Sequence, residues 1–182
     1  MLRYLSTTFG VFIPFLLQAV VTVESTQQIS WLDDDMPASL QIGQTYTIGF
    51  TYDESFNATN TTGSSVIFDG AVTAFSLTIP EAGFSVTGNS GAAELHQDGG
   101  DTFFSLMMPG DSNVVLDGQE FNGAWITFPD MDNLFDGLFA AAALPDQAQL
   151  DTITEEPAFT FSFYDPSGST SGSVSASSSS QG

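Results

Sequence analysis

The sequence predicts an all-β protein, an antiparallel, jelly-roll-like β-sandwich with one short helix near residues 134–144. Three observations predict this fold. Apolar and polar residues alternate in several segments, turn-forming residues separate these segments, and 42% of the 182 residues are hydrophobic, including 17 phenylalanines. Short strands with one apolar face bury that face by packing two layers together. A chain of this length can form one domain with a full core.

The clearest strands are three segments in which apolar and polar side chains alternate. Residues 45–52 carry four apolar side chains on one face and threonine or glycine on the other. Residues 75–79 and 159–164 alternate in the same way, and Pro80 ends the first of these two. A period of two sends successive side chains to opposite faces of a strand. We therefore expect a strand in each segment.

Weaker apolar runs predict the remaining strands. Clusters of Gly, Pro, Asn and Asp lie between them, and one such cluster, residues 109–113, is predicted as a polar turn. The expected strands are residues 20–31, 66–72, 84–87, 92–96, 102–108, 113–117, 121–128 and 171–176.

One segment predicts a helix. Residues 134–144 place four alanines among leucine and phenylalanine, a composition that favours the α-helix. Asp132 or Asn133 is expected as the N-cap, and Pro145 is expected to end the helix. We expect this helix to cover one end of the sandwich.

The chain divides into three parts. Residues 1–19 combine Arg3 with a short apolar run and a small residue at a cleavage point, which predicts a secretory signal peptide. Residues 20–166 form the β-sandwich domain. Residues 167–182 form a tail of Ser, Gly and Thr, in which a final edge strand is expected around Val174. The mature protein is therefore expected to be secreted, extracellular or on the cell surface.

The charge balance excludes several classes of partner. Twenty-two acidic residues stand against one basic residue, Arg3, and one histidine, giving a net charge of −21. Such a chain cannot neutralise phosphates, so we expect no nucleic-acid partner and no anionic membrane surface. The sequence has no cysteine, which excludes disulfides and thiolate chemistry. The acidity indicates either adaptation to a salty medium or specific divalent-cation sites.

The sequence predicts no catalytic residues. Its single histidine, His96, has acidic neighbours, but a triad also needs a nucleophile and an oxyanion hole. Residues 110–113, Gly-Asp-Ser-Asn, superficially resemble the nucleophile block of GDSL-type hydrolases. The Asp-x-x-His that supplies the base in those enzymes does not follow in the sequence. Pairs such as Glu155 and Glu156 are expected by chance among so many acids. We therefore expect a protein that is not an enzyme.

Two acidic clusters are candidate calcium sites, because calcium takes oxygen ligands from loop carboxylates. No other cofactor is expected, and neither cluster has the EF-hand spacing. The alternative is that both are solvated acidic turns. The candidate ligands are Asp33, Asp34 and Asp35 in the first cluster, and Asp130, Asp132 and Asp136 in the second.

One tryptophan is a candidate for ligand binding. Trp31 lies beside the acidic turn of the first cluster and is expected to be exposed, where its ring could stack on a sugar. Trp125 is flanked by Ala124 and Ile126 and is expected in the core, together with Tyr46 and Tyr52.

Four strand sequences resemble a family of exported bacterial proteins. They are GQTYTIGFTYD at residues 43–53, AFSLTI at 74–79, FTFSFYD at 159–165 and SGSVS at 171–175. In this order they resemble the exported β-proteins that carry a PEP-CTERM (exosortase-associated) sorting tail. The resemblance implies a surface or matrix role without known chemistry. That family's tail, Val-Pro-Glu-Pro followed by an apolar helix and a basic end, does not follow Val174.

The sequence thus favours a non-catalytic, strongly acidic structural or interaction protein at the cell surface or in the extracellular matrix. Its expected partner is an extracellular polysaccharide or a surface protein. The alternative is a small glycan- or calcium-dependent binding module.

Overall fold

The computed structural model describes residues 19–129, 133–154, 156–167 and 171–176. The expected signal peptide, residues 1–19, lies outside this part of the chain except for Ala19. Antiparallel strands make up most of the described residues, joined by three short helical segments.

The strands are β1 (Val20–Gln28), β2 (Trp31–Leu32), β3 (Thr45–Asp53), β4 (Asn60–Thr61), β5 (Ser65–Ile79), β6 (Phe84–Gly88), β7 (Gly91–Asp98), β8 (Asp101–Leu116), β9 (Gln119–Phe128), β10 (Ala158–Tyr164) and β11 (Ser171–Ala176). The helical segments are the 3-10 turn η1 (Pro80–Ala82) and the helices α1 (Leu134–Ala141) and α2 (Gln147–Leu150).

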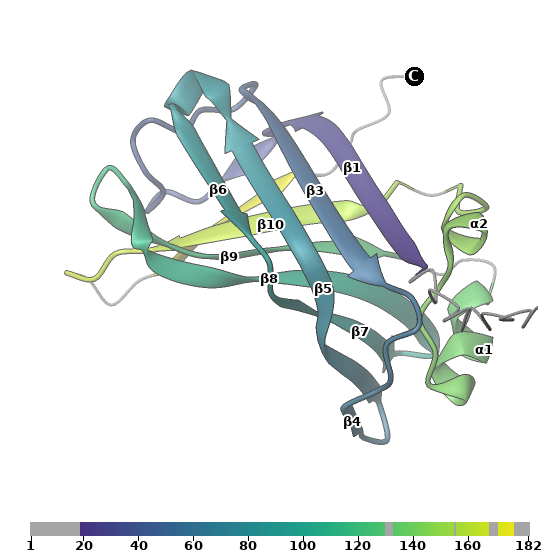
Figure 1. Cartoon of the computed structure of the whole chain (residues 1–182). Helices are drawn as coiled ribbons and strands as arrows, with labels where there is room; N and C mark the ends of the chain where they lie inside the picture. Colours follow the sequence, from purple (N-terminus) through teal and green to yellow (C-terminus); the bar gives the residue numbers. More distant parts are fainter. Residues whose placement is uncertain (1–18, 130–132, 155, 168–170, 177–182) are drawn as a thin grey trace, which may run out of the picture.

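All of these strands belong to one sheet that curls into two facing layers (Figure 1). β1, β3, β6 and the second half of β5 form the first layer. β8, β9, β10 and β11 form the second layer, and β7 pairs β5 with β8 at the bend. The predicted all-β sandwich is confirmed. From β3 to β11 the sheet follows the chain as a meander, without the Greek keys of a jelly roll.

The N-terminal strands close the sandwich by crossing from one layer to the other. β1 pairs with β3 in the first layer along its whole length. The backbone N–H of Ile29 then donates to the carbonyl of Gln44 over 2.9 Å, and the carbonyl of Ile29 accepts from Gly43 over 2.8 Å. Beyond this point β2 pairs with β11 in the second layer. Strands that switch layers form the corners of packed sheets.

Aromatic rings fill the space between the layers. Tyr46 of β3 meets Phe161 of β10 edge to face, with the ring centroids 5.5 Å apart. Phe84 of β6 meets Phe163 of β10 in the same way at 5.2 Å. Each contact of this kind joins the first layer to the second and adds about 0.5–1.5 kcal/mol beyond the burial of the rings. Tyr46 is fully buried, as predicted.

Tyr52, the second tyrosine predicted in the core, is also fully buried. Its hydroxyl donates to the carbonyl of Pro145 over 2.6 Å, which ties β3 to the segment between the two helices. Burial, together with the negative charges of Glu54 and Asp146, raises the pKa of Tyr52. The hydroxyl therefore keeps its proton and remains a donor.

The predicted helix is present as α1, but it ends at Ala141 with Ala142 at a positive φ of 51°, so Pro145 does not end it as expected. Asn133 occupies the N-cap position but makes no side-chain capping bond. The hydroxyl of Thr102 at the start of β8 donates to the carboxylate of Asp136, and Phe135 is fully buried, so α1 covers one end of the sandwich. Within the described residues, no helix is long and apolar enough to cross a membrane.

The predicted turn at residues 109–113 is wrong, because these residues lie inside β8 and join the two strands expected on either side. Pro109 and Asp111 still pair with β9, and a register shift between Asp111 and Val115 takes up the extra residues as a bulge. Proline is tolerated here because no strand pairs with the other edge of β8 in this stretch.

Two further expected strands, residues 66–72 and 75–79, are likewise one strand. β5 spans both, with a register shift between Asp69 and Val72 around Gly70, whose φ is +92°. The strand expected around Val174 is β11, and it has a pairing partner on each side, β10 and β2.

Gly88 of β6 is required by the packing of its neighbour Phe75. The two residues face each other across β5 and β6. A Cβ atom added to Gly88 would lie 2.1 Å from the Phe75 ring, whereas one added to Gly137 of α1 would meet nothing within 4 Å.

We expect Gly88→Ala to lower the free energy of unfolding by roughly 1–3 kcal/mol, because the added methyl group overpacks the site. The matched variant Gly137→Ala should raise it by roughly 0.5–1 kcal/mol, because alanine favours the helix. Urea denaturation of the two variants measures both effects. Equal or greater stability of Gly88→Ala would contradict the packing of Phe75 on β6.

Candidate functional site

His96 is part of a ring pair on the hairpin of β7 and β8. It lies directly opposite Phe103, with the ring centroids 5.1 Å apart and the rings 18° from parallel. The side chain is half-buried. Asp98 and Asp101, the carboxylates expected beside the imidazole, lie at the turn of the same hairpin. The contact that the structure gives for His96 is therefore stacking on a phenyl ring.

The first acidic cluster lies on the loop after β2, where Asp34 and Asp35 are exposed. The loop is held by its backbone: the Asp33 carbonyl accepts from the Met36 N–H over 3.3 Å, and the Asp35 carbonyl accepts from the Gln119 side chain over 2.8 Å. The side chains of Asp34 and Asp35 are thus at the surface of a turn, and Asp33 is half-buried.

Only one residue of the second acidic cluster can be placed. Asp130 and Asp132 lie outside the described residues, and Asp136 accepts the hydrogen bond from Thr102. In the described part of the chain, no three acidic or histidine side chains gather as a metal ion would require. The calcium sites stay a prediction.

The two tryptophans lie in one row across the outer face of the second layer. Register pairs Met107 of β8 with Trp125 of β9, and Trp125 with Thr160 of β10. Thr160 pairs with Ser175 of β11, which pairs with Trp31 of β2. Directly paired residues share a face of the sheet. Met107, Trp125, Thr160 and Trp31 form what we call the tryptophan row, in which the backbone of β11 connects β10 to β2.

Both tryptophan side chains of the row are exposed, Trp31 by 48% and Trp125 by 37%. The expected exposure of Trp31 is confirmed, and the expected burial of Trp125 is wrong. The flanking Ala124 and Ile126 are fully buried, and strand alternation then turns Trp125 outward. The same alternation in the sequence could have identified it.

The spacing within the row follows from the strand pairing. Trp125 and Trp31 are separated by three strand-to-strand steps, which is about 14 Å at the usual strand spacing. Thr160 lies between them. A second row on this face pairs Val115 with Glu120 and Glu120 with Tyr164, and the side chains of Val115 and Tyr164 are exposed. Much of the exposed large apolar surface is thus on one face.

The turn between β8 and β9 holds the chain that follows Trp31. Asp117 and Gly118 both have positive φ, 51° and 85°, as a tight hairpin turn requires. The carboxylate of Asp117 accepts from the Ser39 N–H over 2.6 Å. Hydrogen bonding from the Ser39 side chain, together with this backbone bond, lowers the pKa of Asp117, so the acceptor stays charged. Leu32 packs against the core, which leaves its neighbour Trp31 facing outward.

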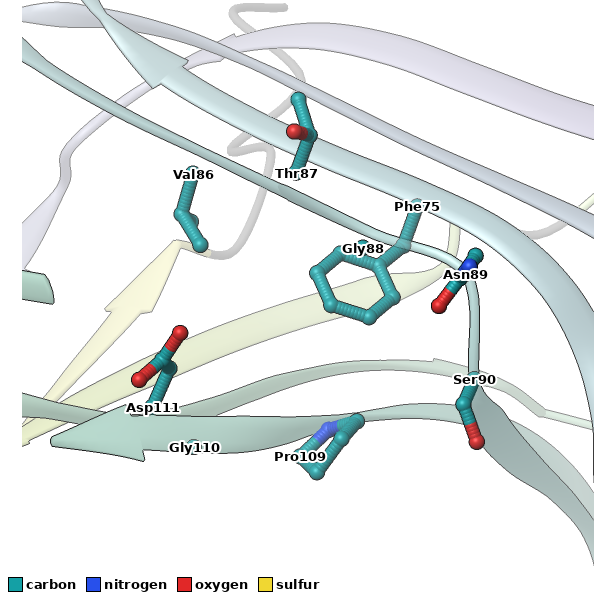
Figure 2. Close-up of a pocket in the computed structure, with 9 residues that line it drawn as sticks. All are labelled: Phe75, Val86, Thr87, Gly88, Asn89, Ser90, Pro109, Gly110 and Asp111. Carbon is teal, nitrogen blue, oxygen red and sulfur yellow. The ribbon is translucent and has the colours of Figure 1, made fainter. Parts of the chain in front are cut away.

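A second candidate surface is an opening between the layers, drawn in Figure 2. β7 and β8 stop pairing at Ala92 and Met107, and the strands beyond them diverge. The resulting hollow has a volume of about 330 Å³. We call it the seam; its lining is Phe75, Val86, Thr87, Gly88, Asn89, Ser90, Pro109, Gly110 and Asp111.

The walls of the seam differ in chemistry. Phe75 and Val86 present apolar groups from the first layer, and Asp111 points toward them from β8 (Figure 2). The Asp111 carboxylate accepts from the backbone and the side chain of Asn113, at 2.9 and 2.8 Å. These bonds lower the pKa of Asp111. The seam therefore joins an apolar wall to a carboxylate that stays ionised.

The net charge of −21 predicts a strong dependence of stability on salt. Carboxylates that repel one another in the folded chain are screened by added ions. We expect the thermal midpoint at neutral pH to rise by roughly 5 °C or more between about 10 mM and about 0.5 M NaCl. The rise should shrink near pH 4, where carboxylates take up protons.

The same melts test the calcium prediction. A bound ion stabilises the folded state by mass action. Millimolar CaCl2 should then raise the midpoint beyond NaCl of equal ionic strength, and EDTA should reverse the rise. Equal midpoints would contradict the prediction, and Asp130→Asn and Asp33→Asn would assign a positive result to one cluster.

Comparison with protein-family models, curated proteins and solved structures finds no match for this chain. The resemblance to exported proteins of the PEP-CTERM type stays a prediction. The geometry of the tryptophan row and of the seam is therefore the basis for assigning a function.

Proposed function

We propose that this is an exported, non-catalytic interaction protein of the cell surface or extracellular matrix, and that it binds a neutral polysaccharide through the tryptophan row. The observation that carries the proposal is the exposure of Trp31 and Trp125 on one row of one sheet face. The signal peptide predicted from residues 1–19 supports export.

Exposing the apolar surface of two tryptophan rings to water is unfavourable, and covering the rings with a ligand removes that cost. A large aromatic ring buries more apolar area on binding than most other side chains. Contiguous apolar surface on a soluble protein marks a binding site, whereas isolated exposed residues need no explanation. Trp31 and Trp125 are aligned by the register of three successive strand pairings, so their relative position is set by the sheet.

The charge of the chain selects the kind of ligand. With 22 acidic residues and a single basic one, the protein repels polyanions at long range. Neutral sugar rings carry no charge and offer apolar faces that stack on tryptophan. Thr160, between the two tryptophans, has a hydroxyl that can hydrogen-bond to a sugar. A neutral polysaccharide lying across the strands therefore fits the row best.

The test is retention of the protein on insoluble neutral polysaccharides, namely cellulose, chitin and xylan. We expect Trp31→Ala and Trp125→Ala each to weaken retention roughly tenfold, as loss of a central aromatic contact does. Ile42→Ala is the matched control, because Ile42 is exposed by 67% but lies outside the row.

Two results would overturn the proposal. The first is a wild-type protein that none of the three polysaccharides retains. The second is a Trp31→Ala, Trp125→Ala double variant that binds as well as Ile42→Ala. Repeating the retention assay in EDTA shows whether binding also depends on calcium. Calcium-dependent binding is the alternative predicted from the sequence.

A further inference from the structure

The seam lies between two strand edges that have no partner strand in the described residues. β6 pairs with β5 on one side only. β8 pairs with β7 as far as Met107, and beyond it only with β9. Unpaired backbone N–H and C=O groups on such edges can hydrogen-bond to an added strand.

The two edges differ in how readily another strand could pair with them. β8 carries Pro109, which lacks an N–H, and a bulge between Asp111 and Val115, and both features discourage pairing. β6 has the sequence Phe-Ser-Val-Thr-Gly, without proline or charge, and its pairing with β5 shows no register shift. The edge of β6 is therefore the one built to accept a strand.

The space beside β6 supports the same conclusion. The seam opens along β6 and is floored by Phe75 and Val86, which are almost fully buried yet line the hollow. A second hollow of about 280 Å³ continues from it past Ser90 and Pro109. The backbones of β7 and β8 lie close together at Gly91, since a Cβ atom added there would lie 2.3 Å from the Met107 carbonyl oxygen.

The charge of the surroundings indicates the chemistry of the added strand. Asp111 faces the seam from β8, and Asp69 lines the adjoining hollow. The whole chain carries a net charge of −21 and no basic residue after Arg3. A basic segment is drawn to this surface, whereas an acidic segment or a second copy of the chain is repelled.

We propose that the free edge of β6 binds an extended, basic segment of a partner protein, which adds to the sheet as a new strand. Backbone hydrogen bonds to β6 would supply much of the affinity. Alternate apolar side chains of the segment would cover Phe75 and Val86. Its basic side chains would lie on the outer face beside Thr87, where the net negative charge of the chain attracts them without contact to Asp111. This partner site is separate from the tryptophan row.

The experiment uses a ten-residue peptide of alternating Lys and Val as the probe. Binding is followed by amide hydrogen exchange and by titration, with the full chain. We expect slowed exchange in β6, Phe84–Gly88. A peptide of alternating Lys and Pro has the same charge but cannot pair as a strand, and it should bind at least roughly tenfold more weakly and protect nothing in β6.

A matched pair of variants assigns the edge. Thr87 on β6 and Thr22 on β1 are both exposed, and each lies on a strand with only one pairing partner. Thr87→Lys should weaken binding of the Lys-Val peptide roughly fivefold, because lysines then face each other across the new pairing. Thr22→Lys makes the same change in net charge and should leave the affinity within about twofold.

Three results would overturn the inference. They are equal binding of the Lys-Val and Lys-Pro peptides, protection of β1 in place of β6, and no binding of the Lys-Val peptide at low salt. Retention on polysaccharides is measured separately, so failure of this inference and failure of the proposed function can be told apart.

Discussion

The fold depends on aromatic packing between two layers that have no other strong attraction. Residues 4–182 contain no lysine or arginine, so ion pairs with such side chains cannot offset the repulsion among the carboxylates. Cohesion must come from apolar burial and from hydrogen bonds. Tyr46, Phe84 and their partners on β10 supply that burial where the layers face each other. Every functional surface described above is an outer face or an open side of this packed interior.

The two outer faces of the sandwich differ in character. The face of the first layer carries hydroxyl pairs, such as Thr22 with Thr51 at 3.2 Å and Thr26 with Thr47 at 3.0 Å. The face of the second layer carries Trp125 and Trp31. The threonine hydroxyls of the first face hydrogen-bond to one another, whereas the second face exposes apolar area. This asymmetry is why we propose a ligand for the second face and not for the first.

Strand alternation allowed much of the fold to be predicted from the sequence, because it is a local signal. Residues 45–52 are a strand with a buried tyrosine near each end, as expected. The errors have physical reasons. Pro109 and Gly110 usually mark a turn, but here a bulge and an unpaired edge accommodate them within β8. The apolar neighbours of Trp125 favour a core position, but the period of two places its side chain on the opposite face.

The candidate surfaces were less predictable, because they depend on which strands become neighbours. Trp31 could be identified alone, but its alignment with Trp125 arises only from pairing through β10 and β11. The seam exists because β7 and β8 part after Met107, where nothing in the local sequence announces a change of partner. Such contacts between distant segments are set by the whole chain.

The layer crossing at Ile29 has a consequence for biogenesis. Because β2 (Trp31–Leu32) pairs with β11 (Ser171–Ala176), which lies far from it along the chain, the sandwich cannot close until both segments are present. Contacts this distant along the chain slow the search for the native state. Under the export proposed above, the sheet would close only after residues 171–176 had crossed the membrane.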